Sequence, residues 1–142
     1  MVTETSIVTV RLLQPHDIEN SLRLLYAMQQ EMHWAHYKPP SVEELVWFLA
    51  GLSYLSVAVH EDDIIGICGG SIQRHPCFPS VPYVLEEVLY VCPQWRHETA
   101  GMRLVRELRD WGWRQGAQAL VIGRPTRQGE IIRWYRRRGH HV

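Results

Sequence analysis

The segment PQWRHETAGMRL, residues 93–104, has the composition of a loop that binds phosphate at the start of a helix. An apolar run typical of a strand precedes it, and a periodic run typical of a helix follows. The first amides of a helix lack intrahelical partners, and together with the helix dipole they favour an anion. Thr99 can cap the helix or bind phosphate through its hydroxyl, and Arg96 adds positive charge. Glu98 is an acid at this anion site, and the alternative interpretation is a structural turn between strand and helix.

Two adjacent acids, Glu86 and Glu87, lie in the otherwise apolar run of residues 83–91. Side chains alternate between the two faces of a strand, so one acid must point toward the core or a cleft. Apolar surroundings raise the pKa of a carboxyl group toward the range that a general base needs. The alternative for Glu87 is an ordinary salt bridge on one face of a sheet.

His33 and His36 lie on nearly one face of a helix and are a weak candidate for a metal site. No third ligand follows at a recognisable spacing, so we expect no metal. Cys68, Cys77 and Cys92 are odd in number and lack the CxxC spacing. They therefore indicate neither a disulfide framework nor a zinc knuckle.

The elements that position these residues follow from hydrophobic periodicity. Residues 7–13 are apolar and β-branched, which predicts a first strand. Apolar positions three to four residues apart predict a helix over residues 17–33, with Asp17 as its cap. Ser41 and Glu44 have the spacing of a capping box that opens a second helix.

Strand and helix patterns alternate through the rest of the chain. Residues 54–60 and 64–73 predict a hairpin around an acidic turn. The later elements expected are a strand over residues 83–91, a helix over 99–115, a strand over 117–123 and a helix over 128–138. A hairpin half is thus followed by a βαβ half, and we expect a mixed α/β (α+β) fold.

Composition and charge narrow the class of protein. The 142 residues, 46% of them apolar, predict a single domain over residues 1–142 with a sizeable core. No leader pattern or long apolar run is present, so we expect a cytoplasmic protein and no membrane span. Residues 1–95 contain four Lys/Arg and eleven Asp/Glu, whereas residues 96–142 contain eleven and four. The split indicates an anionic ligand for the second half and a cationic one for the first, unless the opposite charges are simply neighbours.

The second half of the chain resembles the GNAT family of acyl-CoA-dependent N-acetyltransferases. In that family a strand of the type E-x-L-x-V-x-P leads into an R/Q-x-x-G-x-G/A loop and a helix. Here the strand is EVLYVCP from Glu87, and the loop is RHETAG from Arg96. The later WYRRRGH is similar to a Y-x-x-x-G-F signature, with Tyr135 and Gly139 in register. Thr99 stands in place of the first glycine of the loop motif.

The resemblance implies acetyl-CoA as co-substrate and a splayed central sheet flanked by helices. It implies Glu87 as general base and Tyr135 as the acid that protonates the CoA sulfur. The backbone near Val91 would pair with the pantetheine arm and hold the thioester carbonyl. The resemblance carries cofactor binding to Leu89, Tyr90, Val91, Arg96, His97, Glu98, Thr99, Ala100, Gly101, Met102 and Gln128. By position, His33, Trp34, His36 and Tyr37 would line the acceptor site.

The family normally adds two further strands after the position where this chain reaches Val142. We therefore expect truncated C-terminal strands and an open sheet edge that a homodimer mate or a partner protein covers. Arg136, Arg137 and Arg138 would spread over different faces of a helix, so nucleic acid is not expected.

Two functions remain open from the sequence. One is an N-acetyltransferase that moves the acetyl group of acetyl-CoA to a primary amine of a protein or a small molecule. The other is a catalytically weak or inactive GNAT-like protein that binds and modulates a partner protein.

Overall fold

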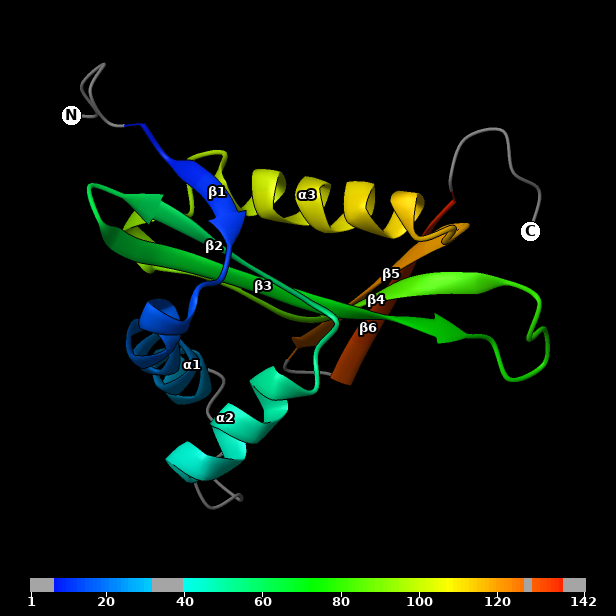
Figure 1. The fold of residues 1–142 in the computed structure, drawn as a ribbon, viewed down its shortest axis with the longest axis horizontal. Coiled ribbons are helices and arrows are strands. Elements are labelled where there is room, and N and C mark those ends of the chain that lie inside the picture. The colour runs from blue at the N-terminus through cyan, green and yellow to red at the C-terminus, as the bar shows by residue number, and fades with distance from the viewer. Residues whose placement is uncertain (1–6, 32–39, 127–128, 137–142) are drawn as a thin grey trace.

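The computed structural model describes residues 7–31, 40–126 and 129–136. Within these residues one six-stranded sheet has helices on both of its faces (Figure 1). The helices are α1 (Ile18–Glu31), α2 (Val42–Ala50) and α3 (Ala100–Arg114), with 3-10 helices η1 (Pro15–Asp17) and η2 (Pro93–Trp95). The strands, which follow chain order across the sheet, are β1 (Thr9–Leu12), β2 (Tyr54–His60), β3 (Asp63–Arg74), β4 (Pro82–Val91), β5 (Ala119–Thr126) and β6 (Gly129–Arg136).

The sheet opens between β4 and β5. These two strands are parallel, whereas the other neighbouring strands pair antiparallel. The parallel ladder runs from the pair Tyr83 and Ala119 to the pair Glu86 and Ile122. Beyond Glu86, β4 continues to Val91 beside β3 alone among the described residues. The splayed mixed sheet expected from the sequence is therefore confirmed.

β4 contains a β-bulge at Glu87. Glu86 lies opposite Gly70 of β3 and Val88 lies opposite Gly69, so Glu87 is an extra residue in β4. A bulge interrupts the alternation of side chains and re-aims one of them. Glu86 is buried, whereas Glu87 is exposed.

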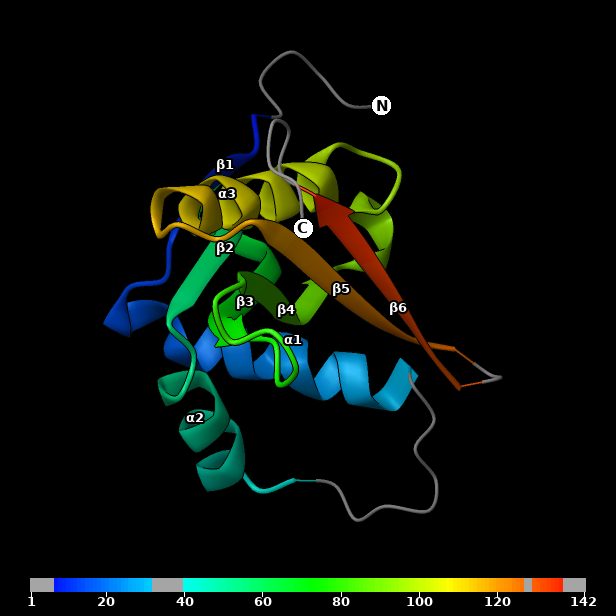
Figure 2. The same cartoon turned by 90° about the vertical axis from the view of Figure 1, so that its right-hand side faces the viewer.

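Each face of the sheet is covered by its own helical layer. α3 packs on one face, and α1 and α2 pack on the other (Figures 1 and 2). The core on the α3 side includes Ala58, Cys68, Val84, Leu104 and Leu108. The core on the α1 and α2 side includes Leu25, Leu45, Leu49, Val57, Ile67 and Val88.

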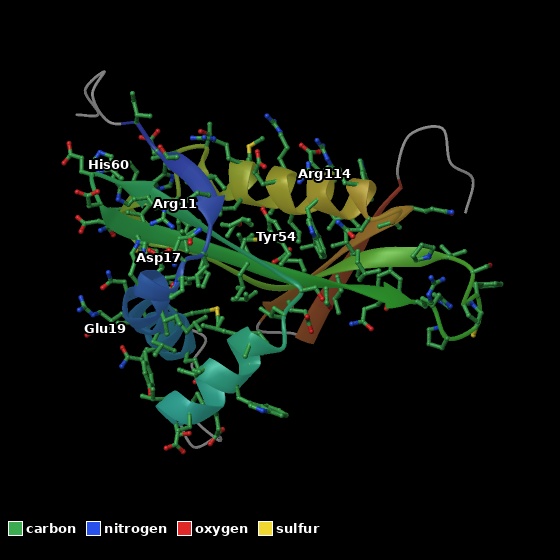
Figure 3. The ribbon with its side chains drawn as sticks, viewed as in Figure 1. Arg11, Asp17, Glu19, Tyr54, His60 and Arg114 are labelled. Atoms are coloured by element: carbon green, nitrogen blue, oxygen red, sulfur yellow. The ribbon has the colours of Figure 1, made fainter. Side chains whose placement is uncertain are left out.

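α3 lies close against the sheet because one position on it is glycine. A Cβ atom at Gly112 would lie 2.9 Å from Cγ1 of Val84, which is too close for any other residue without movement. On the same helix, Trp111 stacks on Tyr54 of β2 with ring centroids 5.1 Å apart, and Figure 3 shows Tyr54 between the sheet and α3. These contacts set the height of α3 above the strands that it connects.

Local sequence signals correctly predicted the first five strands and the three α-helices. The serine half of the predicted capping box is confirmed, since Ser41 Oγ accepts a hydrogen bond from the Glu44 amide at 3.1 Å. The turn between β2 and β3 has positive φ angles of 47° at Glu61 and 69° at Asp62. This geometry suits the twist of a tight hairpin.

The helix predicted over residues 128–138 is wrong, because the segment forms β6. Its residues pair antiparallel with β5, and Tyr135 lies opposite Leu120. The spacing of Ile131, Ile132 and Trp134 suits one face of a helix, yet β-branched and aromatic residues also favour strands. Pairing as a strand satisfies the backbone groups along the edge of β5, which a helix would leave open. The expectation of an open edge at the fifth strand is corrected by the same observation.

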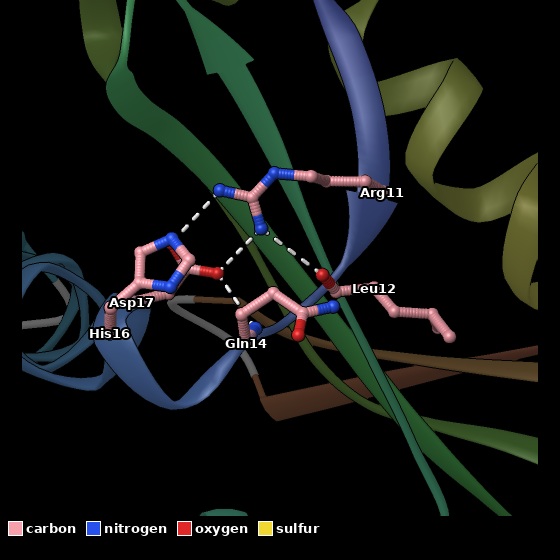
Figure 4. A network of polar contacts seen from close by, with 5 residues as sticks. All are labelled: Arg11, Leu12, Gln14, His16 and Asp17. Carbon is pink, nitrogen blue, oxygen red and sulfur yellow. Dashed lines mark hydrogen bonds and ion pairs between the residues drawn. The ribbon is translucent and has the colours of Figure 1, made fainter.

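Asp17 is not the N-cap that was predicted; it is the third residue of a capping box in which Gln14 is the cap of η1. Its carboxylate accepts hydrogen bonds from Arg11 Nη1 at 2.6 Å, Arg11 Nη2 at 2.9 Å and the backbone amide of Gln14 at 2.7 Å (Figure 4). The Asp17 side chain is only 3% exposed, and the Arg11 side chain is 35% exposed. This ion pair joins β1 to the start of α1 (Figure 3).

The Arg11–Asp17 pair predicts a dependence of stability on pH. The hydrogen bonds from Arg11 lower the pKa of Asp17 from 3.8 to about 2. A lowered folded-state pKa stabilises the protein above the unfolded value, and this stabilisation is lost as the pH falls from 3.8 through about 2. We expect Asp17→Asn to lower the free energy of unfolding at pH 7 by about 2 kcal/mol. The difference from the unsubstituted protein should shrink in acid.

Urea unfolding at neutral pH and at several acidic pH values checks this expectation. Glu19→Gln is the matched control, because Glu19 on α1 is 87% exposed and lies 3.9 Å from Arg23. An exposed pair of this kind contributes little, so the control should unfold like the original protein. Equal effects of the two substitutions would contradict the assigned role of Asp17.

Candidate functional site

The predicted phosphate loop leads from β4 through η2 into α3. The first intrahelical hydrogen bond runs from the Arg103 amide to the Thr99 carbonyl at 2.9 Å. The amides of Ala100, Gly101 and Met102 therefore precede the hydrogen-bonded part of the helix, where an anion is favoured. Thr99 is exposed, and its side chain makes no capping hydrogen bond.

Most side chains around the start of α3 are exposed. His97 and Glu98 are exposed, whereas Ala100 is buried beneath the first turn. A Cβ atom at Gly101 would meet only Cγ2 of Val91 at 3.7 Å, an ordinary contact. Packing within the protein therefore does not require glycine at this position.

Arg96 is engaged by β4 and α1. Its Nε donates a hydrogen bond to the Val91 carbonyl at 2.9 Å, and its Nη2 donates to Glu31 Oε2 at 2.6 Å and Oε1 at 2.9 Å. Tyr90 Oη also donates to Glu31 Oε1, at 2.8 Å. The Arg96 guanidinium carbon lies 5.3 Å from the centre of the Tyr90 ring. The arginine therefore ties the loop to the end of α1, a long-range contact that sequence patterns did not reveal.

Electrostatics at this cluster follow from its contacts. The hydrogen bond from Arg96 lowers the pKa of Glu31, which keeps the carboxylate charged. Burial, followed by the hydrogen bond to Glu31, raises the pKa of Tyr90 to about 12. Tyr90 therefore stays protonated at neutral pH and acts as a donor to Glu31.

The free edge of β4 directs polar backbone groups into the gap beside β5. The Cys92 amide donates to the Ile65 carbonyl of β3 at 2.8 Å, so the backbone of Cys92 faces β3. Successive residues of a strand face opposite edges, which turns the amides and carbonyls of Val91 and Leu89 toward the gap. The hydrogen bond from Arg96 Nε to the Val91 carbonyl agrees with this orientation of the Val91 backbone. The Val91 amide and both backbone groups of Leu89 remain at the opening.

Glu87 lies on the α2 side of the sheet with an ordered carboxylate. Ser71 Oγ of β3 donates a hydrogen bond to Glu87 Oε2 at 2.8 Å, and Gln73 Nε2 donates to Ser71 Oγ at 2.9 Å. Glu86 lies in the buried layer on the other side, where its charge acts on the Cys68 thiol. The prediction that the two acids point to opposite faces is confirmed.

An open groove of about 550 Å³ lies between Glu87 and α2. Its lining residues are Glu44, Trp47, Phe48, Gly51, Leu52 and Glu87. Trp47 is 82% exposed, which is unusual for so large an apolar side chain. Sequence analysis missed this groove, although one signal was present. α2 has more apolar residues than one buried face can hold, since Leu45 and Leu49 are buried while its other apolar side chains are not.

Several predicted site residues lie outside the described residues or are described only by their backbone. His33, Trp34, His36, Tyr37 and Gln128 lie outside them.

The backbone of Tyr135 belongs to β6, in the row that contains Leu120 and Val84. Val84, the β4 residue of this row, lies three residues before Glu87. Tyr135 lies two strands away from β4, which is about 10 Å across the sheet. The strand register therefore does not set the backbone of Tyr135 beside Glu87.

Within residues 7–31, 40–126 and 129–136, no three His, Cys, Asp or Glu side chains are grouped as a metal site would need. No helix in this part of the chain is long and apolar enough to cross a membrane.

The fold is shared with solved acetyltransferases. A GNAT family acetyltransferase from Staphylococcus aureus is 18% identical, with a TM-score of 0.65 over 95% of this chain and 97% of that one. A GNAT family acetyltransferase from Brucella melitensis in complex with acetyl-CoA is 17% identical, with a TM-score of 0.66 over 82% of this chain and 75% of that one.

A third similar structure is an aminoglycoside acetyltransferase from an uncultured soil metagenomic sample, in complex with sisomicin. It is 17% identical, with a TM-score of 0.64 over 81% of this chain and 76% of that one. A comparison with curated proteins gives no significant match. The model of the acetyltransferase (GNAT) family matches residues 20–140. The chain therefore belongs to the GNAT acetyltransferase family.

Proposed function

We propose that this protein is an N-acetyltransferase that moves the acetyl group of acetyl-CoA to a primary amine. One observation carries the proposal. The free edge of β4 at Leu89 and Val91 lies between the Glu87 carboxylate and the amides that open α3. An extended pantetheine arm can pair with such an edge as an added strand, and its diphosphate suits the start of a helix.

Each cofactor contact in the proposal comes from the chain's own groups. The amides of Ala100, Gly101 and Met102 bind the diphosphate, with the Thr99 hydroxyl as an additional donor. The Val91 amide faces the gap and donates a hydrogen bond to the thioester carbonyl, where negative charge develops. His97, Glu98 and Gln128, which the family motif also assigns to this site, complete the proposed set.

In the proposed reaction Glu87 acts as the general base. The nitrogen of the acceptor attacks the thioester carbonyl carbon, and Glu87 accepts the proton that the nitrogen loses. The carbon–sulfur bond then breaks, and the CoA thiolate takes up a proton. Ser71 orients Glu87 by occupying one carboxylate oxygen, which leaves the other oxygen for the incoming amine. In the proposal Tyr135 supplies the proton to sulfur.

A second candidate function is binding and modulation of a partner protein. The contact between Arg96 and Glu31 favours it, because the loop's arginine is already paired with an acid. Bulky side chains at His97 and Thr99 favour it as well. The outer edge of β6 offers backbone groups to a second copy or a partner strand. For either function we propose a cytoplasmic location.

A calorimetric titration with acetyl-CoA separates the two functions. Micromolar binding together with acetyl transfer to any primary amine supports the enzyme. An absence of binding at millimolar acetyl-CoA would favour the partner protein instead.

We predict that Glu87→Gln lowers kcat/KM about 100-fold while the Kd for acetyl-CoA stays unchanged, because only proton transfer is removed. Steady-state thiol release and calorimetry measure the two quantities. Glu43→Gln is the matched control, since Glu43 is an exposed acid on α2 outside the groove lining. Similar rates for Glu87→Gln and the control would refute the role of Glu87.

We predict that substitutions of Arg96 and Glu31 have different effects on the affinity for acetyl-CoA. If Arg96 turns from Glu31 to a phosphate on binding, Arg96→Ala weakens acetyl-CoA binding about tenfold, the value of one charge-assisted contact. Glu31→Gln should leave the affinity equal or tighter, because it removes a competing acid. Calorimetry on both variants provides the comparison. Equal weakening by both would mean that the pair only anchors the loop.

The proposed role of Tyr135 is to donate a proton to the departing CoA thiolate. Tyr135→Phe should lower kcat at least tenfold without changing the Kd for acetyl-CoA, because the hydroxyl would act only when the thiolate leaves. An unchanged kcat would assign that proton to the solvent.

A further inference from the structure

The groove beside Glu87 contains a second acid, Glu44, which could bind a cation while the reacting amine lies at Glu87. Among the residues that the structure describes, six line the groove; two of them, Glu44 and Glu87, are acids, and none of the six is Lys or Arg. The remaining residues are two aromatics, a leucine and a glycine. A site with this balance attracts cations and gives an alkyl segment an apolar surface.

Helical spacing places the second acid beside an aromatic ring. Glu44, Trp47 and Phe48 are three and four residues apart on α2, so they share one face of the helix. A cation held by the Glu44 carboxylate can therefore lie against the face of the Trp47 indole. Trp47 is 82% exposed, so its ring is free to contact a ligand.

Each carboxylate already has an orienting partner. Ser71 Oγ donates to Glu87 Oε2, and Ser41 Oγ donates to Glu44 Oε1 at 3.3 Å. In both acids one oxygen is fixed by a hydroxyl, and the other can take a proton or an ammonium group. The groove thus presents two anchored carboxylates with Phe48 and Leu52 among the residues that line it.

We propose that the acceptor is a small diamine or polyamine, whose second ammonium group binds Glu44 and Trp47 while the reacting amine lies at Glu87. This inference rests on the proposed function, because it uses Glu87 as the base. The groove volume of about 550 Å³ suits a small molecule. The aliphatic spacer lies along Phe48 and Leu52, and the distance between the two acids selects its length.

The test compares α,ω-diaminoalkanes of three to eight carbons with n-alkylamines of the same lengths, using thiol release from acetyl-CoA. We expect kcat/KM for the best diamine to exceed that of its matched monoamine about tenfold, as a charge contact with a cation–π contribution predicts. One spacer length should be optimal. Equal kcat/KM for the diamines and their monoamines would overturn the proposal.

Two substitutions assign the second cation to its site. Glu44→Gln and Trp47→Leu should each reduce the preference for the diamine over the monoamine at least fivefold, mainly through KM. Glu43→Gln, the neighbouring acid outside the groove lining, should keep the preference of the original protein. A preference that survives both groove substitutions would place the second cation elsewhere and overturn the assignment.

A binding measurement separates failure of this inference from failure of the proposed function. Calorimetry with 1,4-diaminobutane and with n-butylamine, in the presence of CoA, needs no turnover. Diamine binding that Glu44→Gln weakens, without acetylation of any amine, would support the cation site and refute the transferase. Acetylation of monoamines and peptide lysines without diamine preference would refute the cation site and support the transferase.

Discussion

The parallel ladder between β4 and β5 is short, and this shortness arranges the backbone groups of the candidate site. The ladder ends at Glu86 and Ile122, although β4 continues to Val91. Strand backbone groups need partners, so the last part of β4 presents a peptide edge at a gap in the sheet. α3 begins after the same end of β4, and the contact of Gly112 with Val84 holds it against the sheet. An unpaired strand edge and the amides of a helix N-terminus are thereby brought to one place.

The bulge at Glu87 places an acid in the groove beside α2. In a regular strand Glu87 and Val88 would point to opposite faces, but the extra residue lets both lie on the α2 side of the sheet. Val88 packs in the core beneath α1 and α2, while Glu87 reaches the groove and is held by Ser71. One backbone irregularity therefore combines a packing contact with a solvent-accessible carboxylate. Glu86, one residue earlier, lies in the buried layer on the other face, where its charge acts on Cys68.

The cluster of Arg96, Glu31 and Tyr90 connects the two halves of the molecule. It joins the loop before α3 to the end of α1, and it uses the Val91 carbonyl at the mouth of the gap. The positive second half of the chain thus meets the acidic first half directly, as one of the two interpretations of the charge split expected. A ligand phosphate would compete with Glu31 for the same guanidinium group. In the proposed function, cofactor affinity and the position of α1 would therefore be linked through this one side chain.

Elements with local causes could be predicted from the sequence. Ser41 and Glu44 cap α2 across three residues, and the hairpin turn at Glu61 and Asp62 lies between alternating apolar runs. The loop motif likewise located the start of α3, because capping, turn and periodicity signals act within a few residues. Tertiary packing was needed to establish that the last segment pairs as β6, that Arg96 contacts Glu31 65 residues away and that Trp47 faces a groove. Those outcomes depend on which backbone edges and side chains remain without a partner once the other elements have packed, and no local pattern records that.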